Sequence, residues 1–215
     1  MDIVTRHNRI YLEVQKTIIK LHNFAKESFI HGCYIPEIVC DDLVKYFDDN
    51  LERHNDGHMF NEIEGHYVDT DRKDSKDISF LIYENKEDAE LLSQYFFYLD
   101  LCHAEYEHRY NRVKYLSRYN VDNHVNIQKY EPGGGYKTWH YERAGLRDAA
   151  RCLVFMTYLN DVPDGGTEFK YQNITAPAKK GLTLIWPSDW THTHKSQISQ
   201  TQKKYIITGW YSYIE

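Results

Sequence analysis

The chain has 215 residues, 41% of them hydrophobic and 27% charged, a composition ordinary for one globular domain. Its net charge of -6 does not favour binding to the negatively charged backbone of nucleic acid. No apolar run approaches the length of a membrane span. Residues 1–7 lack the basic-then-apolar order of a signal peptide, and the four scattered cysteines have no CxxC spacing. These features favour a cytoplasmic protein without a disulfide framework, and they do not indicate an oligomeric state.

The first 122 residues are predicted to be mostly helical. Pro36 can open a helix at its first position, and apolar residues follow at roughly helical spacing, namely Ile38, Val39, Leu43, Val44, Phe47 and Leu51. A second helix is expected after Asn85 and towards Leu116, with a buried side formed by Leu91, Leu92, Tyr95, Phe96, Leu99, Cys102 and Tyr106. Between the two helices, residues 69–77 are too polar to bury and are expected to form a loop.

From Asn123 the pattern changes to that of short strands. Val125 and Ile127 alternate with polar neighbours, and residues 152–159, 182–186 and 205–213 are apolar, β-branched or aromatic runs. Turn signals rich in proline and glycine separate them at residues 132–135, 163–166 and 177–181. The order predicts an α+β chain with a mainly β core, built as a sandwich or a jelly roll. We expect a single domain over residues 1–215, with 1–122 as a mostly helical support layer and 123–215 as most of the core.

Three residues of the strand-rich half have the chemistry of a mononuclear iron site. Such a site needs two imidazoles and one carboxylate on the same side of the metal. His140 and Glu142 are two residues apart, so on a strand their side chains point to the same face, and His194 can add the second imidazole. Lys204, ten residues further on, is a cation suited to a carboxylate co-substrate. The alternative is a surface pair at a strand end, since a chain with 12 histidines contains such pairs by chance.

The order of these motifs resembles that of the prolyl 4-hydroxylase-like 2-oxoglutarate and Fe(II)-dependent dioxygenases. Residues 130–142, with the sequence YEPGGGYKTWHYE, resemble the first metal-binding region of that family, and residues 151–160 resemble the strand that follows. Residues 164–169 resemble its GG turn, and residues 177–210 its closing half. The resemblance covers about residues 123–213. It implies a double-stranded β-helix with an N-terminal α-helical support layer.

The resemblance also implies roles for eight residues. His140, Glu142 and His194 match the iron ligands, Lys204, Tyr158 and Tyr130 match residues of the 2-oxoglutarate pocket, and Arg151 and Trp210 match residues on the substrate side. Tyr130 is equally well explained as an ordinary buried strand tyrosine, and Arg151 is unremarkable as a surface arginine.

Two of these assignments have rivals next to them in the sequence. His192 competes with His194, but the family places its basic residue about ten positions beyond the distal histidine, which favours His194. Lys203 competes with Lys204, but Lys204 shares a strand face with Trp210, and the family points both of these residues inward.

Glu142 departs from the aspartate that is usual in the family. The extra methylene moves the carboxylate by roughly one bond length, and misplacements of about 1 Å can cost ~100-fold in a site of fixed geometry. Glutamate still binds metals, and a backbone adjusted around it would restore the distance. We therefore expect a small effect on iron binding and a modest one on catalysis.

The predicted activity is Fe(II)- and 2-oxoglutarate-dependent hydroxylation of a C–H bond by O₂, with release of succinate and CO₂. The resemblance implies a prolyl residue in a peptide as the first candidate substrate and a small amino-acid-like molecule as the second, although likeness of fold does not fix the substrate. It also implies ascorbate as a further cofactor. One alternative is a cupin-like metal enzyme of another class, which favours His-x-His at the first motif. The other is a non-catalytic metal- or ligand-binding jelly-roll module, which a broken ligand set would favour.

Residues 68–79 are predicted to form a mobile cover over the substrate side. They make a charged connection without an apolar period, and loops of this length in a compact domain are usually functional or disordered. Closing such a loop would exclude water from the metal. The alternative is a solvated connector without a role.

Overall fold

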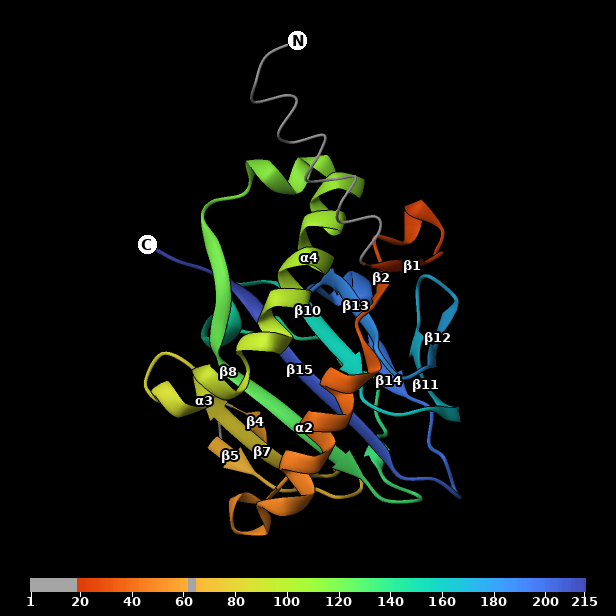
Figure 1. The fold of residues 1–215 in the computed structure, drawn as a ribbon. Helices are drawn as coiled ribbons and strands as arrows, with labels where there is room; N and C mark the ends of the chain where they lie inside the picture. Colours follow the sequence, from red (N-terminus) through yellow and green to blue (C-terminus); the bar gives the residue numbers. More distant parts are fainter. Residues whose placement is uncertain (1–18, 62–64) are drawn as a thin grey trace.

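A large antiparallel sheet forms the centre of the molecule in the computed structural model, which describes residues 19–61 and 65–215 (Figure 1). Its strands follow the order β1-β2-β13-β10-β15-β8-β7-β3. Their bounds are Lys20–His22 (β1), His31–Tyr34 (β2), Asn55–Asp56 (β3), Lys76–Leu81 (β7), Tyr119–Tyr130 (β8), Arg151–Tyr158 (β10), Leu182–Pro187 (β13) and Lys204–Tyr213 (β15). The long strands of the C-terminal half therefore occupy the middle of this sheet.

A smaller sheet and two strand pairs complete the β structure. The small sheet has the order β12-β11-β14, with Val162–Phe169 (β11), Ile174–Ala178 (β12) and His194–Ser196 (β14). The pairs join Met59–Asn61 (β4) to Gly65–Tyr67 (β5) and Lys73–Asp74 (β6) to Gly135–Tyr136 (β9). A buried cluster joins side chains of β10 and β13 to Phe169 and Ala176 of the small sheet. The two sheets thus share a core, as the predicted jelly roll requires.

Helices cover the other face of the large sheet (Figure 1). They are α2 (Glu37–Asp49), α3 (Lys86–Leu91) and α4 (Ser93–Arg109). Leu153 and Phe155 of β10 belong to the core beneath the helices, whereas Val154 and Met156 belong to the core between the sheets. A strand buried on both faces reads as a continuous apolar run, which explains the pattern of residues 152–159.

The two expected helices form with different ends. The helix after Pro36 is α2, in which Val39, Leu43 and Phe47 are buried while Ile38 is exposed. The helix after Asn85 divides into α3 and α4, because the backbone of Leu92 leaves the regular helical path between them. The Asn85 side chain accepts hydrogen bonds from the backbone N–H of residues 87 and 88, a standard way to begin a helix.

The prediction that residues 69–77 are too polar to bury was wrong for part of the segment. A turn leads into β6 and β7, and Lys73 and Asp77 are each only 6% exposed. Their side chains form an ion pair at 2.7 Å. Charged groups are buried at tolerable cost when they are paired and hydrogen-bonded, and the periodicity of a sequence does not show such partners.

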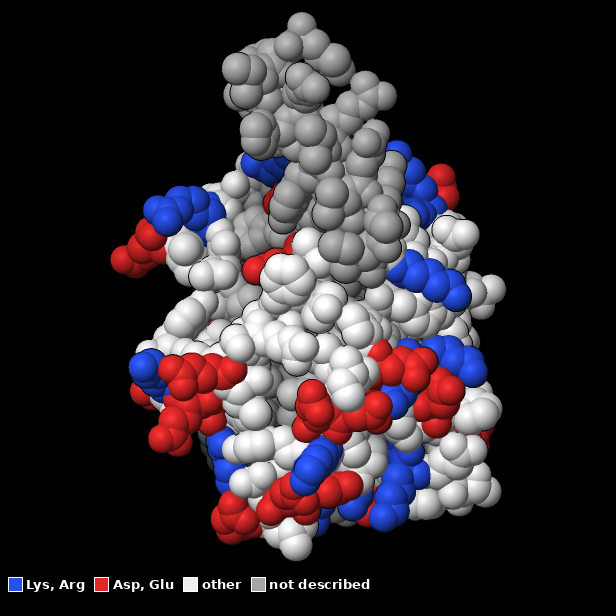
Figure 2. Space-filling model, viewed as in Figure 1, with Lys and Arg blue, Asp and Glu red and all other residues white. Residues whose placement is uncertain are grey.

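Charge is mixed on the face of the molecule shown in Figure 2, where basic and acidic side chains alternate rather than gather into a field of one sign. The four cysteines are free and buried. Among the described residues, no helix is both long and apolar enough to cross a membrane.

Candidate metal centre

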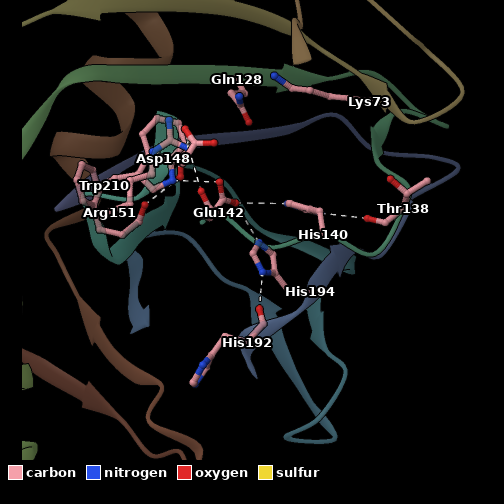
Figure 3. Close-up of polar contacts among 12 residues, drawn as sticks. Lys73, Gln128, Thr138, His140, Glu142, Asp148, Arg151, His192, His194 and Trp210 are labelled. Carbon is pink, nitrogen blue, oxygen red and sulfur yellow. Dashed lines mark hydrogen bonds and ion pairs between the residues drawn. The ribbon is translucent and has the colours of Figure 1, made fainter. Parts of the chain in front are cut away.

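Three side chains from two distant parts of the sequence converge on one point (Figure 3). Glu142 Oε1 lies 3.5 Å from His140 Nε2 and 3.5 Å from His194 Nε2. These atoms all lie within 4.8 Å of one another, a spacing that could hold a metal ion. Ligands about 2.0–2.2 Å from a metal and at right angles to each other would lie roughly 3 Å apart. The two distances from Glu142 exceed that spacing by only about 0.5 Å.

Backbone hydrogen bonds, rather than a regular strand, hold the first two of these residues. The expectation that His140 and Glu142 lie on a strand was wrong. His140 forms an isolated bridge with His194, the first residue of β14, with backbone N–O distances of 3.0 and 2.9 Å. The backbone N–H of Glu142 donates to the carbonyl of Ser188 at 3.1 Å. The bridge brings the two imidazoles together directly, and the anchor at Ser188 fixes the carboxylate beside them.

Both histidines are held in the tautomer that suits a metal. Nδ1 of His140 lies 3.0 Å from the carbonyl oxygen of Thr138, and Nδ1 of His194 lies 2.8 Å from that of His192. A carbonyl only accepts, so each Nδ1 must carry the proton, and each Nε2 presents a lone pair to the centre. Burial, followed by the neighbouring His194, lowers the pKa of His140, which favours the neutral ring.

His192 lies outside this group. Its Nε2–H donates to the backbone carbonyl of Ser28 at 2.9 Å, and its Nδ1 lies 3.0 Å from the hydroxyl of Thr191. Both ring nitrogens are therefore engaged elsewhere, and His194 is the better candidate ligand of the two.

The second oxygen of Glu142 has a partner that the sequence did not indicate. Trp210 Nε1–H donates to Glu142 Oε2 at 3.1 Å. The guanidinium of Arg151 stacks over the Trp210 ring at 3.7 Å, pairs with Asp148 at 3.0 Å and donates to the Glu142 carbonyl at 3.1 Å. Arg151 is therefore held by several partners rather than free at the surface. It contacts Glu142 in two ways, by its own hydrogen bond to the backbone carbonyl and by stacking on the indole that bonds to the carboxylate.

A tyrosine stacks on one of the candidate ligands. The rings of Tyr136 and His140 lie 3.5 Å apart between centroids, with an interplanar angle of 15°. Tyr136 lies on β9 and pairs with Lys73 of β6. The segment at residues 73–77 thus contacts the metal centre through Tyr136, a link that no spacing rule in the sequence indicates.

A buried cation on β15 reaches towards the small sheet. Lys204 is 4% exposed, and burial lowers its pKa to about 8. Its Nζ donates to the carbonyls of Gly165 at 2.9 Å and Gln197 at 3.3 Å. Within the described part of the chain, no carboxylate lies within ion-pair distance of this ammonium, which has a third N–H to donate. A buried cation with donors to spare suits an anionic ligand, whereas Lys203 is exposed.

The two predicted pocket tyrosines are buried, and one of them lies against this cation. The Tyr130 ring lies 5.2 Å from Lys204 Nζ, and Tyr130 pairs with Lys204 between β8 and β15. The Tyr158 hydroxyl is hydrogen-bonded to Thr167 at 2.6 Å. The structure thus brings Tyr130 directly to Lys204, and it joins Tyr158 to the small sheet through Thr167.

The comparisons with known proteins agree with this arrangement. Residues 125–212 match the model of the 2OG-Fe(II) oxygenase superfamily. This match supports the predicted enzyme class, a 2-oxoglutarate/Fe(II)-dependent oxygenase, and the superfamily implies Fe(II), 2-oxoglutarate and O₂. The search of curated proteins found no match.

Solved structures show the fold. A viral collagen prolyl hydroxylase from Paramecium bursaria Chlorella virus-1, solved with 2OG, is 16% identical with a TM-score of 0.59, and the match covers 86% of this chain and 97% of that one. A Pseudomonas putida prolyl-4-hydroxylase is 15% identical, with a TM-score of 0.60 and coverages of 85% and 90%. A prolyl hydroxylase from Trichoplax adhaerens, bound to a peptide fragment of a hypoxia inducible factor oxygen degradation domain, is 15% identical, with a TM-score of 0.62 and coverages of 99% and 94%. The predicted fold, a double-stranded β-helix with a helical layer, is confirmed.

Proposed function

We propose that this protein hydroxylates a C–H bond of a prolyl residue in a peptide, with conversion of 2-oxoglutarate and O₂ to succinate and CO₂. The observation that carries the proposal is the convergence of two imidazole lone pairs and one carboxylate oxygen, with both tautomers fixed by backbone carbonyls. This is the donor set of a non-haem Fe(II) oxygenase, with one face left open.

His140, Glu142 and His194 would hold the iron. Lys204 would bind the distal carboxylate of 2-oxoglutarate, since it is a buried cation whose described hydrogen-bond partners are both neutral carbonyls. Tyr130 and Tyr158 would form the walls around that carboxylate. O₂ is the oxidant of the proposed reaction, and 2-oxoglutarate and the substrate C–H bond each give up two electrons to it. Fe(II), when bound, would supply the site at which O₂ is activated, and the chain's part is to orient the groups and exclude water.

Arg151 and Trp210 would lie on the substrate side of the metal. Their stack is held by Asp148 at one end and by Glu142 at the other. Trp139 and Tyr141 flank His140 in the sequence and are each 40% exposed. Exposed aromatic rings give a surface on which a peptide chain can pack, which supports a peptide as the first substrate class. A small amino-acid-like molecule is the second, and ascorbate is proposed as a reductant that maintains Fe(II).

The proposal is tested by anaerobic titration of the protein with Fe(II) and then with 2-oxoglutarate, followed by visible absorption for the weak charge-transfer band of the chelate. Proline-containing peptides and free amino acids are then screened with O₂. The readouts are succinate and a product heavier than its substrate by one oxygen atom, about 16 mass units. Absence of the band at saturating iron would contradict the proposed co-substrate. Succinate formation coupled only to a free amino acid would replace the peptide as substrate.

A further inference from the structure

A chain of four buried polar side chains connects β6 and β7 to the proposed co-substrate pocket. Lys73 Nζ lies 2.7 Å from Asp77 Oδ2, and Gln128 Nε2 lies 3.1 Å from the same oxygen. The Tyr130 hydroxyl lies 2.7 Å from Gln128 Oε1. All four residues are at most 7% exposed. Figure 3 shows Gln128 and Lys73 on the side of the site opposite His192.

The chemistry of these groups fixes the direction of every hydrogen bond. The carboxylate of Asp77 is paired with an ammonium and only accepts, so the NH₂ end of the Gln128 amide must face it. The carbonyl end of Gln128 then faces Tyr130 and also only accepts. The hydroxyl proton of Tyr130 is therefore donated to Gln128, and the phenol oxygen keeps only lone pairs for any other partner.

The orientation of Asp77 is fixed from both sides. Its other oxygen, Oδ1, accepts a hydrogen bond from the Ser75 hydroxyl at 2.7 Å. The backbone carbonyl of Ser75 accepts from the N–H of Gly57 at 2.9 Å. A Cβ at Gly57 would lie 2.2 Å from Ser75 Oγ, so the two segments fit closely only because residue 57 is glycine. Asp77 cannot turn to release Gln128 without disturbing this packing.

We infer that Asp77 and Gln128 are positioning residues that hold Tyr130 as a hydrogen-bond acceptor, with its proton directed away from the co-substrate. The inference rests on the proposed function, because it concerns the pocket for 2-oxoglutarate. The Tyr130 ring lies 5.2 Å from Lys204 Nζ. A carboxylate of 2-oxoglutarate only accepts hydrogen bonds, so Lys204 would bind it, whereas Tyr130, whose one proton goes to Gln128, would shape the pocket without a hydrogen bond to the ligand.

Binding of 2-oxoglutarate to the Mn(II)-loaded protein, measured anaerobically by calorimetry, tests the inference. Tyr130→Phe alone should change the dissociation constant less than about twofold, since the lost proton was not donated to the ligand. Gln128→Met keeps the shape of the side chain and frees the Tyr130 proton for the ligand. In that background, Tyr130→Phe should weaken binding by about tenfold, the effect of one hydrogen bond to a charged group.

Asn126 provides the matched control. It is an amide on the same strand, two residues from Gln128, and it bonds to Ser79 at 2.7 Å rather than to Tyr130. In an Asn126→Leu background, Tyr130→Phe should remain without effect. A tenfold loss from Tyr130→Phe in the otherwise unchanged protein would overturn the inference, because the hydroxyl would then donate to the ligand.

A second measurement separates this inference from the proposed function. In the metal-free protein, the side-chain NH₂ signals of Gln128 should exchange slowly with solvent by NMR, and faster in the Lys73→Met/Asp77→Asn double variant, which avoids leaving an unpaired buried charge. Slow exchange together with no binding of 2-oxoglutarate would show that the proposed co-substrate is wrong. The inferred role of Tyr130 in the 2-oxoglutarate pocket would then be overturned as well. Binding of 2-oxoglutarate together with fast exchange would overturn the positioning role alone.

Discussion

The two carboxylate oxygens of Glu142 have different neighbours. Oε1 lies 3.5 Å from both histidines, while Oε2 accepts the indole N–H of Trp210. A glutamate has one more rotatable bond than an aspartate, so its carboxylate needs more support to stay in one orientation. The indole supplies that support, and the stack of Arg151 on the ring holds the indole in turn.

Replacing Glu142 by aspartate should therefore weaken metal binding, although aspartate is the usual residue of the family. The shorter side chain would move the carboxylate away from the histidines or from Trp210, because the backbone at Glu142 is anchored to Ser188. Loss of such orienting partners typically costs 10–100-fold in metal affinity, so we expect a loss of about 10-fold. Titration with Mn(II), followed by its EPR signal, measures this. Trp210→Phe keeps the ring under Arg151 and should show a similar loss, and unchanged affinity in both variants would contradict this reading.

The two neighbouring histidines should separate clearly in metal binding. His194→Ala should abolish iron retention after desalting, because it removes one of the three converging donor atoms. His192→Ala should retain iron, since both nitrogens of His192 bond to other groups, and should instead lose stability at the contact with Ser28. Equal loss of iron in both variants would show that the donor set has been assigned wrongly.

Lys204 predicts opposite pH effects on co-substrate binding and on folding. Burial lowers its pKa from 10.5 to about 8, so above pH 8 the free protein increasingly carries a neutral amine there. Affinity for 2-oxoglutarate should then fall by up to about tenfold per pH unit. Between pH 8 and 10.5 the unfolded chain holds the proton that the native state has lost, so the contribution of Lys204 to stability rises with pH.

Substitutions at this position check the assignment. Lys204→Ala should cost on the order of 2–5 kcal/mol in 2-oxoglutarate binding and largely spare the metal. Lys204→Arg keeps the charge through pH 9, so its residual binding should not depend on pH. Lys203→Ala, at an exposed neighbour, is the matched control. If affinity for 2-oxoglutarate falls in Lys203→Ala and not in Lys204→Ala, then Lys203 binds the co-substrate and the assignment to Lys204 is wrong.

At the scale of elements, the segment at residues 65–81 divides into two parts. Its first part, through the turn at residues 69–72, is half-buried or exposed, while Lys73 and Asp77 lie in buried β structure. Only the first part can act as the predicted cover. The second part is a fixed support that touches Tyr136 on one side and Gln128 on the other.

Substitutions in the two parts should therefore differ in effect. Asp71→Ala together with Arg72→Ala, at the exposed turn, should slow substrate hydroxylation while leaving substrate-free turnover of 2-oxoglutarate nearly unchanged. Asp77→Ala should instead lower the free energy of unfolding by about 3–5 kcal/mol, because it leaves Lys73 buried without its partner. If both turnover rates of the turn variant equal those of the parent, the turn is only a connector.

The elements that the sequence predicted well are those whose pattern depends on one strong periodicity. The run at residues 152–159 identified β10 because both faces of that strand are buried. The candidate ligand set could be identified because several motifs follow one another in one order, whereas a His-x-acid pair alone is common in a chain with 12 histidines. The ion pair of Lys73 and Asp77, and the indole behind Glu142, depend on partners far away in the chain, and no local pattern carries that information.

At the scale of the whole molecule, two cores lie on opposite faces of one sheet. The core between the sheets borders the proposed site, through Tyr130, Tyr158 and Ile206. The core beneath the helices has no residue in the ligand set and contains all four cysteines. The catalytic half and the supporting half therefore meet along the large sheet.

Because of this placement, the reactivity of the four cysteines reports whether the helical layer separates from the large sheet. Cys33 and Cys152 come from strands of the sheet, and Cys40 and Cys102 from the helices above them. Cys33, Cys40 and Cys102 are at most 1% exposed, so a thiol reagent reaches them only when helices and sheet part, while Cys152 is 8% exposed. Burial raises the pKa of Cys40 to about 12 and of Cys152 to about 11, which suppresses the reactive thiolate. Hydrogen bonds with Cys102 and His31 lower the pKa of Cys33 to about 6, so only its burial protects that thiol. Titration with a chromogenic disulfide should be slow in native buffer, and all four thiols should react at one rate in rising denaturant. A Leu146→Cys variant, at a position 91% exposed, should add one thiol that reacts at once.

Rapid reaction of a native cysteine would show that the helical layer opens independently of the catalytic half. The labelling rate would then measure how often the layer opens.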